Sequence, residues 1–331
     1  MSRFGRYLGA AVIVAIVAAG GFGGLRWFGG AVDDPGPLPE ARAVVVPRGS
    51  GDQIAEVLAS DGVIRQPRVF RAAALVTRAE GPLRAGEFAF PAQASVRQVL
   101  AILRFGRPVE HHLTIAEGLT AQQIRAVLAH ADGLIGEVPP MAEGSLLPQT
   151  YDYELGAERG QIVERAKAAM DRELAAAWAD RAPGLALSSP RDALILASIV
   201  ERETARPEER PHVASVYLNR LRLGMRLQAD PTVVYAASGG AGVLDHRLTR
   251  SELDRDNPFN TYRSAGLPPA PICSPGLDSL KAVLHPAASE DLYFVADGSG
   301  GHVFSRSYEA HDNAVARWRA MVPSAPHGSP D

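Results

Sequence analysis

The sequence predicts an α+β protein with an N-terminal transmembrane helix, a small α+β module and a larger mixed α+β domain. Three observations support this prediction: an apolar N-terminal run, a compact pattern of strands and helices over 41–107, and a longer, mainly helical pattern over 108–323. With 331 residues, 46% of them hydrophobic, the chain is long enough for two domains and a sizeable core.

The composition excludes several classes of protein. The formal net charge of -3 is too small to indicate a nucleic-acid partner. Cys273 is the only cysteine, so the chain can form neither an internal disulfide nor a cysteine-rich zinc site. The nine histidines show no metal-ligand spacing. We therefore expect no metal and no cofactor.

Residues 1–30 predict a cytoplasmic tip and a membrane helix. Arg3 and Arg6 precede an apolar run over 7–25, about the 20 residues needed to span a bilayer. Basic residues before the run and acidic residues after it place the N-terminus in the cytoplasm and the remainder outside. A cleaved signal peptide is the alternative, and under either interpretation the bulk of the chain is exported.

A proline-rich stretch over 31–40 predicts a stiff linker to the small module over 41–107. The module is predicted to contain a strand, two short helices, a second strand and a third helix, over 43–46, 54–58, 69–75, 84–90 and 95–106. It carries no catalytic constellation, so its expected role is binding or spacing.

The larger domain begins with a predicted strand over 109–115 and a helix that Thr120 can cap. The segment 143–151 has neither a helical nor a strand period, which predicts a loop that is either functional or a plain connection. Further helices are predicted over 162–178, 191–204, 213–223, 277–284 and 311–321, and a β-hairpin over 292–304. The end of the chain, 324–331, is predicted to be a disordered tail.

The helix over 191–204 is the most informative element. Ile195, Ile199 and Val200 belong to one apolar stripe, and Glu203 projects from the middle of that stripe. Glu201 projects from the opposite side, towards water or a polar partner. Because desolvation raises the pKa of a carboxyl group, Glu203 is a candidate general acid. The structural alternative is that Glu203 pairs with Arg206 or another arginine.

Other polar residues lie in two loops, where the sequence again leaves a functional and a structural interpretation open. Gln228, Asp230 and Thr232 lie around the start of a short helix, where Asp230 could serve only as its N-cap. Asn260 and Tyr262 lie in a loop rich in amides. Both loops are candidates for contacts with a substrate.

Six motifs occur together and in one order along the chain. They are SIVERET at 198–204, NRL at 219–221, LQADPT at 227–232, NTY at 260–262, GLPP at 266–269 and YFVA at 293–296. In this combination the chain resembles the YceG-like endolytic murein transglycosylases of bacteria, the MltG family, over nearly its whole length. The resemblance implies a single-pass inner-membrane protein with a LysM-like module and an extracytoplasmic catalytic domain that has a lysozyme-like catalytic helix.

The resemblance also implies an activity. The family cleaves nascent peptidoglycan strands internally at the MurNAc-GlcNAc bond, leaves 1,6-anhydro-MurNAc ends, and works beside membrane-bound peptidoglycan synthases, which fits a role in ending strand elongation. Its essential glutamate matches Glu203. The residues expected to contact the glycan are Gln228, Asp230, Thr232, Asn260, Tyr262 and Tyr151.

Two other functions fit parts of the sequence. A muramidase-type hydrolase would use Glu203 with Asp230 and a water molecule, as glycosidases with two carboxylates do. A non-catalytic glycan-binding scaffold would use the membrane anchor and the small module. Product analysis separates the first from a transglycosylase, and an inert protein with glycan affinity would indicate the second.

Overall fold

The structure of the protein is a computed structural model, which describes residue 21, residues 23–24 and residues 26–321. Most of the membrane span predicted over 7–25 lies outside these residues, as does the tail predicted over 324–331. Among the residues that are described, no helix combines the length and the apolar character needed to cross a membrane.

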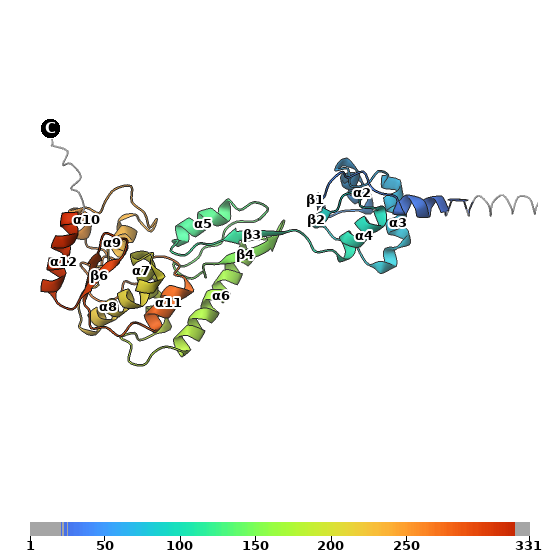
Figure 1. Ribbon diagram of the computed structural model, residues 1–331. Helices are drawn as coiled ribbons and strands as arrows, with labels where there is room; N and C mark the ends of the chain where they lie inside the picture. Colours follow the sequence, from blue (N-terminus) through green and yellow to red (C-terminus); the bar gives the residue numbers. More distant parts are fainter. Residues whose placement is uncertain (1–20, 22, 25, 322–331) are drawn as a thin grey trace, which may run out of the picture. The chain divides into compact units, whose positions relative to one another are not determined.

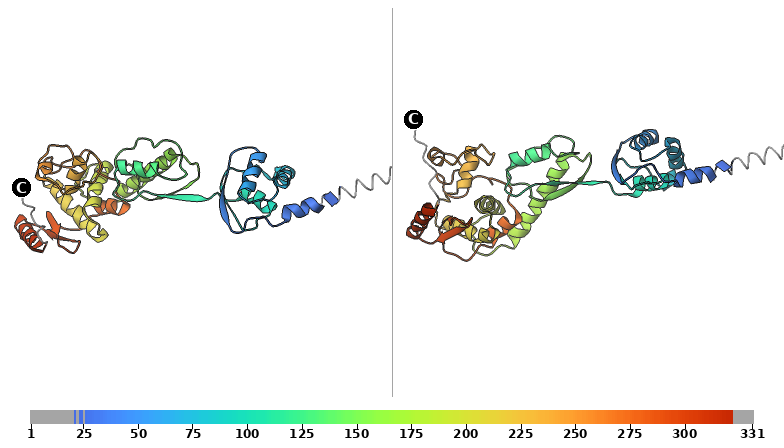
Figure 2. Two further views of the ribbon diagram at one scale, coloured as in Figure 1. Left: turned by 90° about the horizontal axis from the view of Figure 1, so that it is seen from above. Right: turned by 45° about the horizontal axis from the view of Figure 1, so that its top comes forward.

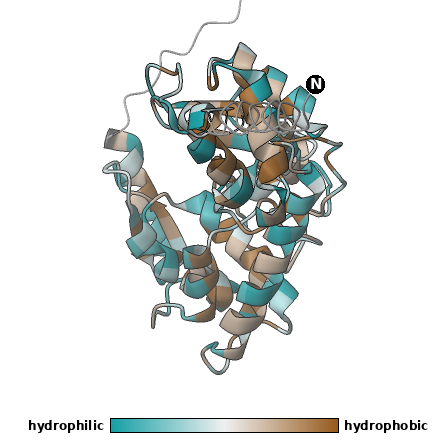
Figure 3. Cartoon of the chain, turned by 90° about the vertical axis from the view of Figure 1, so that its right-hand side faces the viewer, coloured by the Kyte–Doolittle hydropathy of each residue, from teal (hydrophilic) through white to brown (hydrophobic). Residues whose placement is uncertain are grey.

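The described chain divides into two compact units (Figure 1). The N-terminal unit comprises the described residues up to His111 together with Tyr153–Gly156, and the C-terminal unit comprises His112–Asp152 and the described residues from Ala157 onward. Along the helices of both units, hydrophobic and hydrophilic residues alternate (Figure 3), as amphipathic elements around a core require.

The N-terminal unit contains the strand and helix order that the sequence predicts. Strand β1 (Arg42–Val46) pairs antiparallel with β2 (Gly86–Phe90), and three helices surround them: α2 (Gly51–Ser60), α3 (Pro67–Val76) and α4 (Val96–Phe105). Ser50 and Ser95 each close a capping box at the start of α2 and α4, which fixes where these helices begin. Phe70 and Phe88 are fully buried in the core between the strands and the helices.

The segment 31–40 corrects the expected stiff linker. Residues 26–33 are helical, and Val32 and Leu38 are buried in the core of the N-terminal unit. The backbone N–H of Gly36 donates to the carbonyl of Gln93 (3.0 Å), and the N–H of Gln93 donates to the carbonyl of Leu38 (2.9 Å). Because its apolar side chains complete this core, the segment is part of the unit and not a free spacer.

The C-terminal unit is mainly helical. Strands β3 (Glu110–Thr114) and β4 (Thr150–Glu154) form a small sheet, and α5 (Ala121–Ala129) lies between them in the chain. The helices that follow are α6 (Arg159–Ala179), α7 (Pro190–Glu203), α8 (Arg210–Arg222), α9 (Asp230–Ala237), α10 (Arg250–Leu253) and α11 (Leu277–Leu284). An antiparallel hairpin of β5 (Tyr293–Ala296) and β6 (His302–Ser305) follows, and α12 (Tyr308–Met321) packs beside it (Figure 2).

Helix α7 is central in this unit and packs against α6, α8, α9 and α11. Eight consecutive residues, from Ala193 to Val200, are buried, which a helix tolerates only when neighbours cover it on every side. Two predictions need correction. The segment predicted as a loop over 143–151 runs into strand β4 from Thr150, and α7 ends at Glu203, one residue before the predicted end, because Thr204 is already extended.

Candidate active site

Helix α7 delivers its last residue, Glu203, to a cavity on the C-terminal unit. The helix starts with Pro190 in its first turn and a capping box between Ser189 and Asp192, so its register is set from the N-terminal end. The cavity has a volume of about 210 Å³. It is lined by Glu203, Tyr217, Arg220, Leu227, Gln228, Asp230, Tyr262, Phe294, Val295, Ala296 and His302.

The carboxyl group of Glu203 has a hydroxyl partner and no ion-pair partner among residues 26–321. The Tyr217 hydroxyl donates a hydrogen bond to Glu203 Oε1. Arg206, the partner expected in the structural alternative, instead donates to the carbonyl of Ser299 (2.9 Å). Glu203 is therefore held in place without being neutralised by a cation in contact.

Burial raises the pKa of Glu203 to about 7. The hydrogen bond from Tyr217 opposes this shift because it favours the carboxylate, the negative charge of Asp230 adds to it, and the charge of Arg220 opposes it. A carboxyl group with a pKa near 7 holds its proton in a large fraction of molecules at neutral pH. This is the property that a general acid needs.

Glu201 lies on the opposite side of α7 from Glu203, as the helical periodicity predicts, and it has polar partners. Its Oε1 accepts a hydrogen bond from Arg210 Nη2 (3.1 Å), and its Oε2 accepts one from the backbone N–H of Gly276 (2.9 Å). The side chains of Glu201 and Arg210 are only 6% and 9% exposed. Glu201 is thus a buried structural anion outside the cavity.

Three predicted substrate contacts do line the cavity. The Tyr262 hydroxyl donates to Asp230 Oδ1 (2.5 Å), and Asp230 is the first residue of α9 and not its N-cap, which is Ala229. Gln228 has a φ of 51°, in the left-handed region that a residue with a side chain seldom adopts. Its N–H donates to the carbonyl of Thr261 (3.2 Å), which helps to hold this conformation and supports a functional role for the loop.

Three other predicted contacts are corrected, because their polar groups are used inside the fold. The Thr232 hydroxyl is buried against the carbonyl of Ala229 (2.7 Å). The Asn260 amide donates to three backbone carbonyls in and just after α10, and its Oδ1 accepts from the N–H of Tyr262 (2.9 Å). Tyr151 is 2% exposed, and its hydroxyl donates to the carbonyl of Leu147 (2.7 Å). Thr232 and Asn260 instead brace the loops that carry Asp230 and Tyr262.

Several residues that line the cavity are not predicted by any sequence pattern. Tyr217 stood out only as one of the apolar residues of α8, and nothing in the sequence places its hydroxyl beside Glu203. Arg220 donates to the carbonyls of Leu292 (2.7 Å) and Leu227 (2.6 Å), and so connects α8 to the two segments that carry these residues. His302 comes from the hairpin and is held by Glu209 through its Nδ1 (2.6 Å). These contacts depend on tertiary packing and leave no local pattern.

Known protein families and curated relatives share sequence with this chain. The model of the YceG-like family matches residues 44–317. The chain belongs to the YceG-like family. This YceG-like chain is 40% identical over 125 residues, 38% of its length, to the endolytic murein transglycosylase of Bacillus subtilis (strain 168). It is 27% identical over 360 aligned positions, 92% of its length, to the endolytic murein transglycosylase of Streptococcus pneumoniae serotype 2 (strain D39).

These alignments cover 34% and 63% of the lengths of the two relatives, so this YceG-like chain matches only part of each. Among solved structures, it is similar to a putative YceG-like protein from Listeria monocytogenes, with a TM-score of 0.53 and 28% identity. That match covers 83% of this chain and 98% of the Listeria chain.

Proposed function

We propose that the protein is an endolytic peptidoglycan lytic transglycosylase with Glu203 as its acid and base. The observation that supports this most directly is a carboxyl group with a pKa raised to about 7, at the end of a buried helix and open to a cavity. Membership of the YceG-like family and two relatives named endolytic murein transglycosylase support the same reaction class.

The chemistry needs one protein carboxyl group. Glu203 donates its proton to the bridging oxygen as the bond between that oxygen and C1 of MurNAc breaks, which releases the GlcNAc 4-hydroxyl. The C6 hydroxyl of the same MurNAc then bonds to C1, and its proton returns to Glu203. The products are a 1,6-anhydro-MurNAc end and a regenerated acid, and no water is consumed. Because the nucleophile belongs to the substrate, its effective concentration is high.

The other cavity residues suit recognition of a sugar. Tyr262, Gln228 and Asp230 offer hydroxyl, amide and carboxylate groups, which can bind sugar hydroxyls and N-acetyl groups. Phe294, which is only partly buried, supplies apolar surface for a sugar ring. The charge of Asp230 also contributes to raising the pKa of Glu203, so it supports the acid without serving as a second catalytic carboxylate.

The decisive experiment is product analysis with the full-length protein in detergent and uncrosslinked glycan strands as substrate. Mass spectrometry should find internal cleavage with anhydro ends, and Glu203→Gln should give none. Reducing ends in place of anhydro ends would establish the hydrolase, in which Asp230 activates water. Glycan binding by the unaltered protein without any product would establish the scaffold.

We further propose that the apolar run over 7–25 anchors the protein in the inner membrane, with its N-terminus in the cytoplasm and both units outside, beside the synthases that produce its substrate. The supporting observation is the sequence pattern of basic, apolar and acidic residues. The protein should fractionate with membranes, and protease should release it only from the outer side. Recovery of a soluble chain that begins near residue 21 or 24 would contradict this.

A further inference from the structure

We propose that the outward face of α3 rests on the anionic headgroups of the bilayer that holds the N-terminal run, so that the N-terminal unit is a membrane-docked base. This inference rests on the proposed membrane anchorage. It goes beyond that anchorage because it assigns a lipid-binding surface to the folded unit itself.

The helix over 26–33 joins the N-terminal unit through a rigid junction. Val32 is 6% exposed, and Phe28 and Ala31 pack against the same core. The carboxylate of Asp33 accepts hydrogen bonds from Arg97 Nε (2.6 Å) and Nη2 (3.0 Å), which ties the end of this helix to the first turn of α4. The helix therefore cannot swivel freely on the unit, and its direction fixes how the unit faces whatever the preceding residues enter.

The second step is the distance to the bilayer. Trp27 is 62% exposed on this helix, and tryptophan gathers at the interface between membrane and water. Five residues of helix separate Trp27 from the buried Val32, a rise of about 7.5 Å. The headgroup region on each side of a bilayer is of about that thickness, roughly 5–8 Å. If Trp27 lies at the interface, the unit begins where the headgroups end.

The third step is the surface that faces the bilayer. In Figure 1, α3 lies at the end of the N-terminal unit from which the helix over 26–33 leaves, and β1 and β2 lie at the opposite end. Val69, Phe70 and Ala73 bury the inner face of α3. The outer face carries Arg68, Ala72, Leu75 and Val76, which follow the spacing of one helical face, and Leu75 and Val76 are 64% and 72% exposed.

Helix α3 combines the exposed apolar pair Leu75 and Val76 with arginines, which suits a membrane surface. An amphipathic helix that lies in the interface combines apolar side chains with arginines or lysines. Here the apolar pair is at the C-terminal end of α3, and the arginines are at its N-terminal end.

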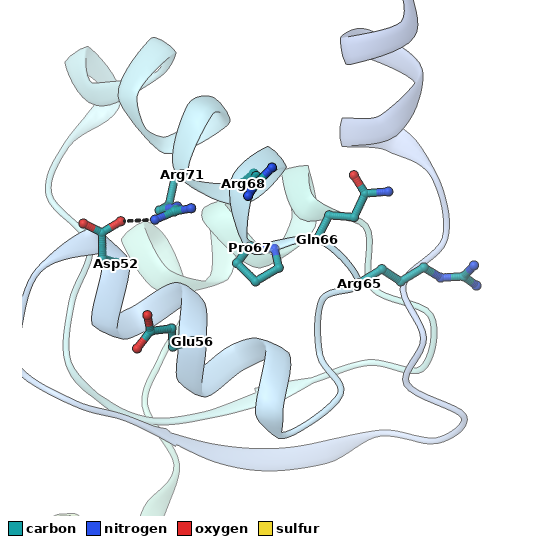
Figure 4. A pocket seen from close by; sticks show the side chains of 7 residues that line it. All are labelled: Asp52, Glu56, Arg65, Gln66, Pro67, Arg68 and Arg71. Atoms are coloured by element: carbon teal, nitrogen blue, oxygen red, sulfur yellow. Dashed lines mark hydrogen bonds and ion pairs between the residues drawn. The ribbon is translucent and has the colours of Figure 1, made fainter.

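A pocket of about 390 Å³ at the N-terminal end of α3 adds a place for a headgroup (Figure 4). It is lined by Asp52, Glu56, Arg65, Gln66, Pro67, Arg68 and Arg71. Arg71 pairs with Asp52 (2.6 Å), so these two charges cancel. Arg65 and Arg68 lie on the other side of the pocket from Glu56 and have no ion pair among residues 26–321 (Figure 4).

The side chains that line the pocket carry a net charge of plus one, and Arg65 also lines a neighbouring cavity with Ala31 and Asp34 at the end of the helix over 26–33. Arginine binds phosphate through two parallel hydrogen bonds, and an arginine near an anionic leaflet is attracted to its negative surface charge. Anionic lipid is therefore the occupant that both the charge and the apolar pair favour.

The test places an environment-sensitive fluorophore on full-length protein reconstituted into vesicles. Leu75→Cys can be labelled selectively because the native Cys273 is 0% exposed. Val45→Cys, on β1 of the same unit and 51% exposed, is the matched control. One set of vesicles contains phosphatidylglycerol with phosphatidylethanolamine, and the other contains phosphatidylcholine alone. Quenching by spin-labelled lipid reports contact with the bilayer.

In anionic vesicles we expect quenching at position 75 to exceed quenching at position 45 several-fold, and to fall in phosphatidylcholine. The double variant Arg65→Glu/Arg68→Glu should lower it to the level of position 45. Arg107→Glu, which reverses the charge of another exposed arginine beyond α4, should leave it unchanged. Equal quenching at 45 and 75, in protein that floats with the vesicles, would overturn the docking surface and leave the anchor intact. Protein that fails to float would overturn both.

Discussion

The two sides of α7 hold glutamates two residues apart in opposite electrostatic settings. Glu201 is buried with a guanidinium and a backbone N–H in contact, so its charge is neutralised within the fold. Glu203 is held by the neutral hydroxyl of Tyr217 and borders a cavity, and burial raises its pKa to about 7. Burial alone therefore does not make a carboxyl group a general acid, because a cation in contact stabilises the carboxylate and gives it a structural role.

The largest expected effect on cleavage is that of Glu203→Gln. Loss of a general acid lowers rates by about 10²- to 10⁴-fold, so we expect no measurable product. The protein should remain folded, because the amide can still accept the hydrogen bond from Tyr217. Activity is measured by chromatography of released glycan and folding by circular dichroism. Substantial activity in this variant would remove Glu203 from the mechanism and with it the contrast between the two glutamates.

The pH dependence of cleavage is the next largest effect. The acid form of Glu203 starts the reaction, so kcat/KM should fall as pH rises above about 7, by about tenfold per pH unit.

The pH dependence of the unfolding free energy should also reflect the titration of Glu203. The native state keeps this proton between the ordinary pKa of 4.5 and about 7, where the unfolded chain releases it. The unfolding free energy contributed by Glu203 therefore falls as pH rises through that window.

Glu203→Gln is the control for the stability measurement, since an amide does not titrate. Denaturant titrations at a series of pH values should show a shallower fall between 4.5 and about 7 for the variant than for the unaltered protein. Parallel curves for the two proteins would show that Glu203 does not carry a raised pKa.

A smaller effect is expected for Tyr217→Phe, which removes the hydrogen bond that orients Glu203. A lost neutral hydrogen bond is equivalent to about a 2- to 10-fold lower rate at the optimum. Because this bond favours the carboxylate, its removal should raise the pKa of Glu203 and move the alkaline limb of the pH profile to higher pH. A shift to lower pH would contradict the assigned donor.

Tyr235→Phe is the matched control for this variant. The Tyr235 hydroxyl also donates to a glutamate, Glu143 (3.1 Å), but neither residue lines the cavity around Glu203. Its pH profile should coincide with that of the unaltered protein.

Glu201→Gln should change cleavage least. Activity per folded molecule should stay within a few-fold of the unaltered protein, because Glu201 does not line the cavity. Its stability should fall by about 1–3 kcal/mol, since Arg210 loses the nearer of its two carboxylate partners in a buried setting. Urea unfolding measures the stability, and the cleavage rate divided by the folded fraction from circular dichroism measures the activity. A dead but fully stable Glu201→Gln protein would reverse the comparison.

Local patterns in the sequence determined the elements on which the site is built. Capping residues and apolar periodicity predicted α7, α8 and α11, the order of strands and helices in the N-terminal unit, and the hairpin of β5 and β6. Each of these signals acts over a few residues, through backbone caps or side chains on one helical face. The same reasoning placed Glu203 on the apolar side of α7 and Glu201 on the other.

Tertiary packing alone decided which polar groups reach the cavity. Asn260 and Thr232 are as polar as Gln228, yet their hydrogen bonds are used inside the fold. The sequence pattern marks Tyr217 as an apolar residue of α8, yet its hydroxyl is the hydrogen-bond partner of Glu203. The linker predicted over 31–40 became core because Val32 and Leu38 found apolar neighbours distant in sequence. A side chain's partner depends on which elements meet in space, and no local period encodes that meeting.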